Sequence, residues 1–236
     1  MQKEAFDEYS EDIFFIVTVL ILSFPSLVSA QGYHIEITLK GLSSDTVILG
    51  EYFTTRMIPK DTIVLDRKGH GVFEGTEPFQ GGLYLVYYSP SRYFDMLLGD
   101  DQEFSIWADT SDFVNSIEFS GSDDNHIFQD YKNYLQLKRG EIEKQQSRLA
   151  NAKSETDSID IRDEIKHVNG DMEAYMDRIE ADHASLFVKS FVGATREPFP
   201  PEDIMNGERR HDDSIRYFYY RNHYFDRFDP FDIRLL

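Results

Sequence analysis

Cysteine is absent from this chain of 236 residues. Its absence excludes disulfides, thiolate nucleophiles, cysteine-based zinc sites, iron–sulfur ligation and lipoprotein acylation for the chain itself. Cationic residues are also few: 24 Lys and Arg stand against 43 Asp and Glu, and the formal net charge is -19. Because nucleic acids and anionic membrane surfaces are bound through clusters of Lys and Arg, this balance argues against both as partners.

The sequence also lacks the motifs of common catalytic and metal sites. It contains no His-Glu-x-x-His, no Asp-x-Asp-x-Asp-Gly loop and no Gly-x-Ser-x-Gly. Arg209–Asp213 offers His and carboxylate groups to a metal, but its two arginines oppose a cation, and Asp123–His126 is better explained as a helix cap. We therefore expect no catalytic, cofactor-binding or metal-binding residues, although two carboxylates distant in sequence could still form an acid–base pair.

An apolar run near the start predicts export. Ile13–Phe24 has the length of a signal-peptide core, and the small residues Val28-Ser29-Ala30 form a cleavage pattern. We expect residues 1–30 to be a signal peptide and the mature chain to begin at Gln31, in the periplasm. The segment before the run carries one Lys and five acidic residues, unlike the usual basic start, so retention as a membrane anchor is the alternative.

Residues 31–121 have the pattern of an all-β domain. Hydrophobic residues make up 41% of the chain, which is enough for a core. Short segments rich in β-branched and aromatic residues alternate with turn residues, and eight of them predict an antiparallel β-sandwich or barrel. The expected strands are His34–Leu39, Thr46–Phe53, Asp61–Leu65, Gly71–Glu74, Leu83–Tyr88, Tyr93–Leu98, Glu103–Ala108 and Ser116–Ser120.

Two details of this domain are predicted as well. Asp61–Leu65 is expected to pair with Gly71–Glu74 as a hairpin across a polar turn that contains glycine. The single tryptophan, Trp107, alternates with Phe104 and Ile106 in a strand, and we expect it in the core.

Residues 122–193 predict a long antiparallel helical hairpin, which makes the fold class α+β. Small polar and acidic residues at Gly121–Asn125 suit a helix start. The first helix extends to about Ala152, and Ser154–Asp157 separates it from the second. Apolar residues of the second helix recur at spacings of 4 and 3, a heptad seam: Ile161, Ile165, Val168, Met172, Tyr175 and Ile179. The alternative is a helical arm that reaches another subunit and forms a homodimer.

Residues 194–236 begin with the stiff connector Glu197–Pro201 and contain an aromatic run, Tyr217–Phe225. The segment is expected to be the truncated start of a companion domain with a helical tail. One interpretation of the run is a protein-contact surface, because Tyr and Arg dominate interface hot spots. Its residues would be Tyr217, Tyr220, Arg221 and Tyr224. The other interpretation, which we favour here, packs Phe218, Arg221 and Phe225 against a core.

These pieces resemble a known arrangement. Gly32–Leu42 and Phe119–Asn125 resemble the N-terminal β domain of unknown function that precedes thioredoxin-like domains in exported proteins of gut-type Gram-negative bacteria. Ala184–Phe191, Tyr217–Phe225 and Asp232–Leu236 resemble the companion domain of unknown function in the same proteins. The resemblance implies that a thioredoxin-fold thiol–disulfide oxidoreductase domain with a Cys-x-x-Cys site follows directly.

No catalytic residue carries over, because this chain has no cysteine and stops where that domain would begin. The expected function is a non-catalytic periplasmic interaction or scaffolding module that positions or recruits protein substrates for a thioredoxin-like oxidoreductase. Its expected partners are a separate protein or its own thioredoxin-like domain, with a homodimer through the helical hairpin as a further expectation. The alternative is a free-standing cell-envelope binding protein that holds a small apolar or glycan ligand in the β domain.

Overall fold

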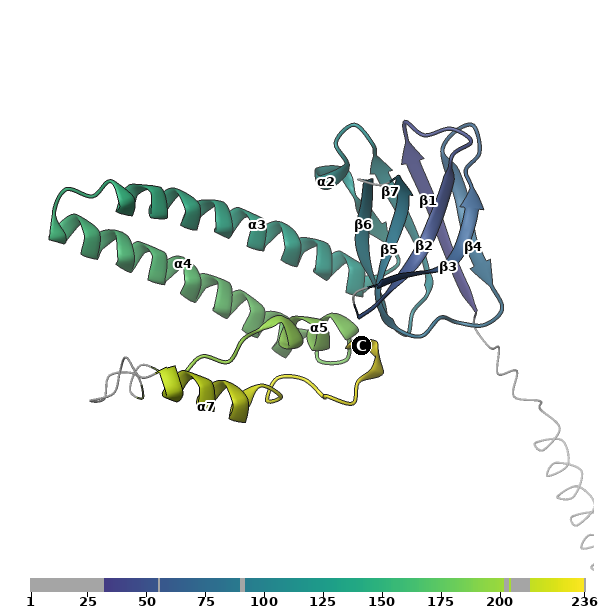
Figure 1. Cartoon of the computed structure of the whole chain (residues 1–236). Coiled ribbons are helices and arrows are strands. Elements are labelled where there is room, and N and C mark those ends of the chain that lie inside the picture. Colours follow the sequence, from purple (N-terminus) through teal and green to yellow (C-terminus); the bar gives the residue numbers. More distant parts are fainter. Residues whose placement is uncertain (1–31, 55, 90–91, 202–203, 205–212, 236) are drawn as a thin grey trace, which may run out of the picture. The chain divides into compact units, whose positions relative to one another are not determined.

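The computed structural model describes residues 32–54, 56–89, 92–201, 204 and 213–235, and within them the strands precede the long helices (Figure 1). The predicted signal peptide, residues 1–30, and most of Arg209–Asp213 lie outside the described residues. No helix in the described part combines the length and apolarity needed to cross a membrane.

Eight strands form two four-stranded sheets, so the predicted α+β class and the predicted β-sandwich are confirmed. The first sheet has the order β4-β1-β7-β8 and the second has the order β3-β2-β5-β6. The strands are β1 (Tyr33–Lys40), β2 (Thr46–Phe53), β3 (Arg56–Val64), β4 (His70–Gly75), β5 (Gly82–Ser89), β6 (Arg92–Leu98), β7 (Glu103–Asp109) and β8 (Glu118–Ser120). The short helix α2 (Phe113–Ser116) includes Ser116, which was predicted to be the first residue of the last strand.

Not every pair of neighbouring strands is antiparallel. β1 pairs with β7 in parallel, with Ile35 opposite Phe104 and Ile37 opposite Ile106. After β1 the chain enters the second sheet and returns to the first only at β4 and β7. A parallel pair needs such a long connection, which a two-residue hairpin cannot supply.

The predicted hairpin between β3 and β4 is wrong. β3 pairs with β2 in one sheet, whereas β4 pairs with β1 in the other. The turn between them is built by Asp66, whose side chain accepts hydrogen bonds from the backbone N–H groups of Lys68 and His70. Gly69 takes a φ of 80°, and a Cβ there would lie 2.3 Å from the Leu39 carbonyl oxygen. The turn therefore passes the chain from one sheet to the other.

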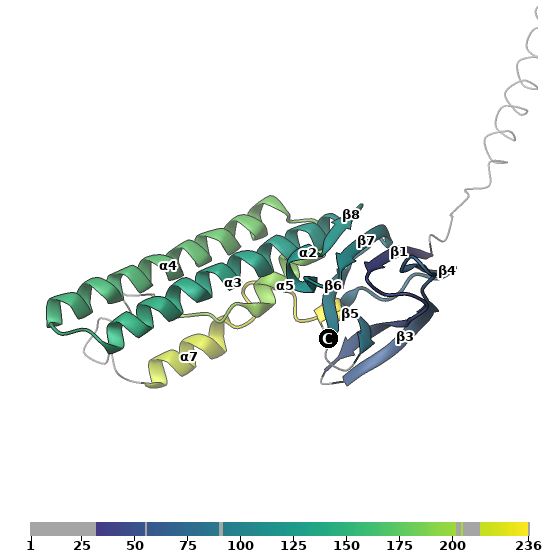
Figure 2. The same cartoon turned by 90° about the horizontal axis from the view of Figure 1, so that it is seen from above.

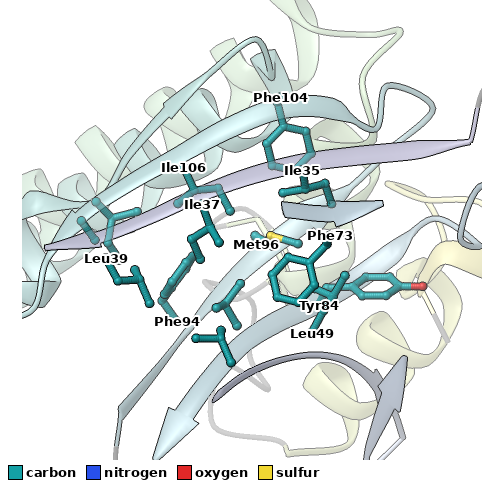
Figure 3. Close-up of a cluster of buried hydrophobic side chains, with 14 of the residues drawn as sticks. Ile35, Ile37, Leu39, Leu49, Phe73, Tyr84, Phe94, Met96, Phe104 and Ile106 are labelled. Atoms are coloured by element: carbon teal, nitrogen blue, oxygen red, sulfur yellow. The ribbon is translucent and has the colours of Figure 1, made fainter. Parts of the chain in front are cut away.

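Inward-facing side chains of the two sheets form the core of the sandwich (Figure 3). Ile35 and Ile37 of β1 are fully buried, as are Phe73 and Tyr84. Burying one such side chain contributes about 1.5–3 kcal/mol.

The predicted core position of Trp107 is wrong. Phe104 and Ile106 are 5% and 2% exposed, whereas Trp107 is 38% exposed. Side chains alternate across a strand with period two, so the odd-numbered Trp107 faces away from the core that its even-numbered neighbours enter.

The predicted helical hairpin is confirmed: α3 (Asp123–Ala150) and α4 (Glu155–Asp182) run side by side and antiparallel (Figures 1 and 2). Each helix has a serine N-cap. The Ser122 hydroxyl accepts from the Asn125 backbone N–H, and the Ser154 hydroxyl accepts from the Asp157 backbone N–H. Within the predicted seam of α4, Ile161, Val168 and Ile179 are buried.

The base of the hairpin packs on the outer face of the second sheet. A second apolar cluster joins β6, α3, α4 and the next helix, α5 (Phe187–Thr195). Its buried members are Leu97, Phe128, Tyr131, Met176, Ile179, Phe187, Val188 and Val192. The 3-10 helix η1 (Ile233–Leu235) contacts both β5 and α5.

The first turn of α3 also closes the free edge of β6. Asn125 is fully buried, and its side-chain oxygen accepts from the Leu97 backbone N–H at 2.8 Å. Its amide nitrogen donates to the Leu97 carbonyl at 2.7 Å. One side-chain amide thus makes the two hydrogen bonds that a neighbouring strand would make. Beside it, Asp124 accepts from the Val188 backbone N–H at 2.7 Å and so caps α5.

Candidate interaction site

The aromatic run forms the helix α7 (Asp213–His223) and the turn after it. No residue of α7 is buried. Phe218 and Phe225 are 54% and 55% exposed, so the favoured interpretation, packing against a core, is wrong for these residues. Periodicity identified the helix correctly, but it could not show whether another element covers it.

The four predicted contact residues occupy one face of α7 and the turn that follows it. Tyr217, Tyr220, Arg221 and Tyr224 follow the spacing i, i+3, i+4 and i+7, which aligns side chains along a helix. The rings of Tyr220 and Tyr224 lie 5.1 Å apart, and Tyr224 also packs at 5.7 Å against Phe228. Tyr217 is 59% exposed. We call this surface the α7 aromatic face.

The opposite side of α7 lines a groove. Tyr219 and His223 stack with ring centroids 4.2 Å apart and face a hollow of about 1880 Å³. Side chains of α3, α4 and α5 and of the connector after α5 form its other walls. We call this hollow the helical groove. Sequence reasoning missed it, because it depends on how three helices are spaced.

A buried arginine holds the connector against α4. The Arg196 side chain is 3% exposed and bonds to Glu173, Asp177 and Glu180. Burial opposes its charge, but the three carboxylates outweigh burial and raise the pKa of Arg196 above its ordinary value. Partial burial likewise opposes ionisation of Asp177, yet Arg196 and Arg227 lower the pKa of Asp177.

Sequence reasoning missed this cluster too. The three acids are spaced i, i+4 and i+7 on α4, a stripe that the sequence does contain. The residues next to Arg196 in the sequence do not indicate that it is the cation that neutralises these three acids. The cluster fixes one wall of the helical groove.

A second polar cluster lies where α3 meets the sheet. The Lys132 ammonium donates to the Asp95 carbonyl at 3.2 Å and lies 4.4 Å from the Phe128 ring centroid. Burial raises the pKa of the Asp95 carboxyl, an effect that Lys132 and Tyr52 partly offset. Burial also lowers the pKa of Lys132, and burial together with Asp95 raises the pKa of Tyr52 to about 12. These groups extend the closure of the β6 edge that Asn125 begins.

The described residues contain no group of three or more His, Cys, Asp or Glu side chains that could hold a metal ion. Arg196 is neutralised by its carboxylates, and Asp95 is not among the residues that line the helical groove. The α7 aromatic face, whose side chains are not buried, and the helical groove are two candidate contact surfaces.

The fold is that of a β-sandwich continued by a helical hairpin. Residues 33–128 match the model of a family described as "Domain of unknown function (DUF4369)". The match confirms the predicted resemblance of the N-terminal β region to a domain of unknown function. It extends into α3 and includes Asn125, the residue that closes the β6 edge. No curated protein matches the chain.

Proposed function

We propose that the chain is a non-catalytic, exported interaction module that positions or recruits protein substrates for a thioredoxin-like thiol–disulfide oxidoreductase. The observation that carries the proposal is the α7 aromatic face. Among the described residues, none of its side chains is buried. Tyrosine and arginine dominate the energetics of protein contacts, and an exposed aromatic surface is a recognised sign of an interaction site. The partner is a separate oxidoreductase or a thioredoxin-like domain of the same protein.

Two further observations support the location and the redox link. The apolar run Ile13–Phe24, followed by Val28-Ser29-Ala30, supports export to the periplasm. The match of residues 33–128 supports the N-terminal part of the resemblance, from which the link to a thioredoxin-like domain comes.

The first test reads the gene beyond the codon for Leu236. We expect a thioredoxin-like domain with a Cys-x-x-Cys site, either in frame or encoded next to this chain. A locus with neither would contradict the redox link and favour the envelope binding protein.

The second test measures binding of that oxidoreductase domain to the full chain by calorimetry. Replacing Tyr217 and Tyr220 together with alanine should weaken binding at least tenfold, because each hot-spot truncation costs about 1–2 kcal/mol or more. Tyr93→Ala is the matched control, since Tyr93 is 49% exposed but lies in β6. Equal binding by the double variant and the control would reject the α7 aromatic face as the contact.

The alternative function places a small apolar or glycan ligand in the β domain. Large buried side chains, including Phe73, Tyr84 and Phe94, occupy the interior between the two sheets. This packing favours the first proposal over the alternative. A ligand that raised the thermal midpoint of the full chain would reverse that preference.

A further inference from the structure

Apolar side chains of α3 and α4 form a strip in the lining of the helical groove. α3 contributes Tyr131 and Leu135, and α4 contributes Met172 and Met176. Arg139 of α3 also lines the groove. Met172 and Leu135 are only partly buried, so part of the strip remains open to solvent. Methionine suits a binding surface because its side chain is flexible and polarisable.

The dimensions of the groove fit one helix. The residues of α3 that line it run from Phe128 to Glu143, a span of about 22 Å at 1.5 Å per residue. A helix of that length and 10–12 Å in diameter occupies about 2000 Å³. The groove is open to solvent on one side and offers about 1880 Å³ of space, which is of the same order as that helix.

Helical walls also favour a helical occupant over an extended one. An extended segment must find partners for its backbone N–H and C=O groups, which it obtains most readily from a strand edge. The groove is lined by residues of α3, α4, α5, the connector and the α7 region, and by no strand. A helix enters with its backbone already bonded and needs only an apolar stripe for the floor.

The charges of the groove differ from those of the rest of the chain. Six Lys and Arg side chains and five carboxylates line it, whereas the whole chain carries a formal charge of -19. Arg196 and Arg227 are engaged by carboxylates of α4. Arg139 and Lys189 form no ion pair with any described carboxylate. These two cations are available to acidic groups of an occupant.

We propose that the helical groove binds an amphipathic helix of about four turns, with an apolar stripe and acidic flanks, from a partner protein. The inference deepens the proposed function and rests on it, since it names the chemistry of the segment that the interaction module recognises. The apolar stripe packs on Met172 and Leu135, and the acidic flanks face Arg139 and Lys189.

The test uses two synthetic peptides of 15 residues and the full chain. Both peptides carry leucines at helical spacing. The acidic one has glutamates on its flanks, and the basic one has lysines at the same positions. Fluorescence anisotropy should show that the acidic peptide binds roughly tenfold more tightly than the basic one. Equal binding of the two peptides, or no binding of either, would overturn the proposal.

Methionine methyl NMR locates the binding without any mutation. The methyl signals of Met172 and Met176 should shift when the acidic peptide is added, whereas that of Met57, in β3, should not. Shifts confined to Met57 would place the peptide on the β domain and reject the groove.

Charge reversal supplies the matched variants. Arg139→Glu combined with Lys189→Glu should weaken the acidic peptide roughly tenfold and strengthen the basic one. Arg162→Glu combined with Lys153→Glu makes the same change in net charge at two exposed positions outside the groove, and it should leave both affinities unchanged. Equal effects of the groove variant and the control would show that only overall charge matters, which would refute the site.

The peptide assay contains no oxidoreductase, so the two proposals can fail separately. If the peptides do not bind but the oxidoreductase still binds through the α7 aromatic face, the groove proposal falls and the proposed function stands. If the acidic peptide binds the groove and the oxidoreductase does not bind, the redox link falls instead.

Discussion

Asn125 should be one of the most sensitive positions in the chain, because it joins the helical hairpin to the sheet. Its side chain bonds to both backbone groups of Leu97, at 2.8 and 2.7 Å, and donates to the Ser122 hydroxyl at 2.9 Å. Asn125→Ala leaves two backbone groups of β6 without partners in a buried place. Each orphaned group costs about 1–3 kcal/mol, so we expect the free energy of unfolding to fall by about 2–6 kcal/mol.

The assay is urea denaturation of the full chain, with the change read from the midpoint at constant slope. Asn133→Ala is the matched control on the same helix, because Asn133 is exposed and accepts one hydrogen bond from Gln129. The control should change stability by no more than about 0.5 kcal/mol. A loss below about 1 kcal/mol for Asn125→Ala would refute the idea that this amide replaces a strand.

Asn125→Asp adds a pH signature to the same reasoning. The carboxyl would be buried beside the Leu97 carbonyl, which raises its folded-state pKa above the unfolded value of about 3.9. Such a group contributes its stability below the unfolded pKa and loses it as pH rises through the folded pKa. The variant should therefore be closest to the parent near pH 4 and furthest from it at pH 7. A difference that stays constant with pH would contradict this account.

Three further outcomes follow from other parts of the molecule. Arg196→Met should lower the free energy of unfolding by about 1–3 kcal/mol at pH 7, a modest loss because two of the three facing carboxylates are more than half exposed. Arg196 lowers the pKa of Asp177 against the opposing effect of burial. The stability lost in Arg196→Met should therefore shrink as pH falls towards about 3 and Asp177 becomes protonated, which denaturation at about pH 7 and at about pH 3 would show. Gly69→Ala should cost more than about 1 kcal/mol in thermal or urea unfolding, because its φ is 80° and the Leu39 carbonyl leaves no room for a Cβ; a neutral result would refute the turn geometry. Leu137 and Ile159 are exposed on the hairpin, and a homodimer through them should appear as a dimer in light scattering. Leu137→Gln combined with Ile159→Gln should convert that dimer to a monomer. A monomeric parent chain would exclude the homodimer.

Patterns local in the chain predicted most of the elements. The heptad seam that includes Ile161 and Val168 and the polar cap at Ser122 were sufficient to place the hairpin, because helix caps and helical periodicity depend on neighbours in sequence. Strand pairing is decided by residues far apart. The partners of β3 and β4 therefore could not be predicted from the turn between them.

Two errors have different physical causes. Trp107 was misplaced because it was assigned to the same side of the strand as Phe104 and Ile106, whereas period-two alternation puts residue 107 on the opposite side from residues 104 and 106. Phe218, Arg221 and Phe225 were expected to pack against a core, because the helical spacing of α7 is the same whether or not a neighbour packs against it. The helical groove and the Arg196 cluster involve helices separated in sequence, so neither could be located before the packing was known.

The side chains by which α3 holds the sheet belong to its first turns. Asn125 and Lys132 bond to β6, whereas the later turns of this 28-residue helix pair with α4. A helix of that length extends about 42 Å. A tilt of about 10° at its base would move the tip by about 7 Å, as follows from that length. The hairpin therefore has the geometry of a long lever that pivots at the β6 edge. A small rotation of α3 there would become a large displacement of the Asn151–Ser154 loop.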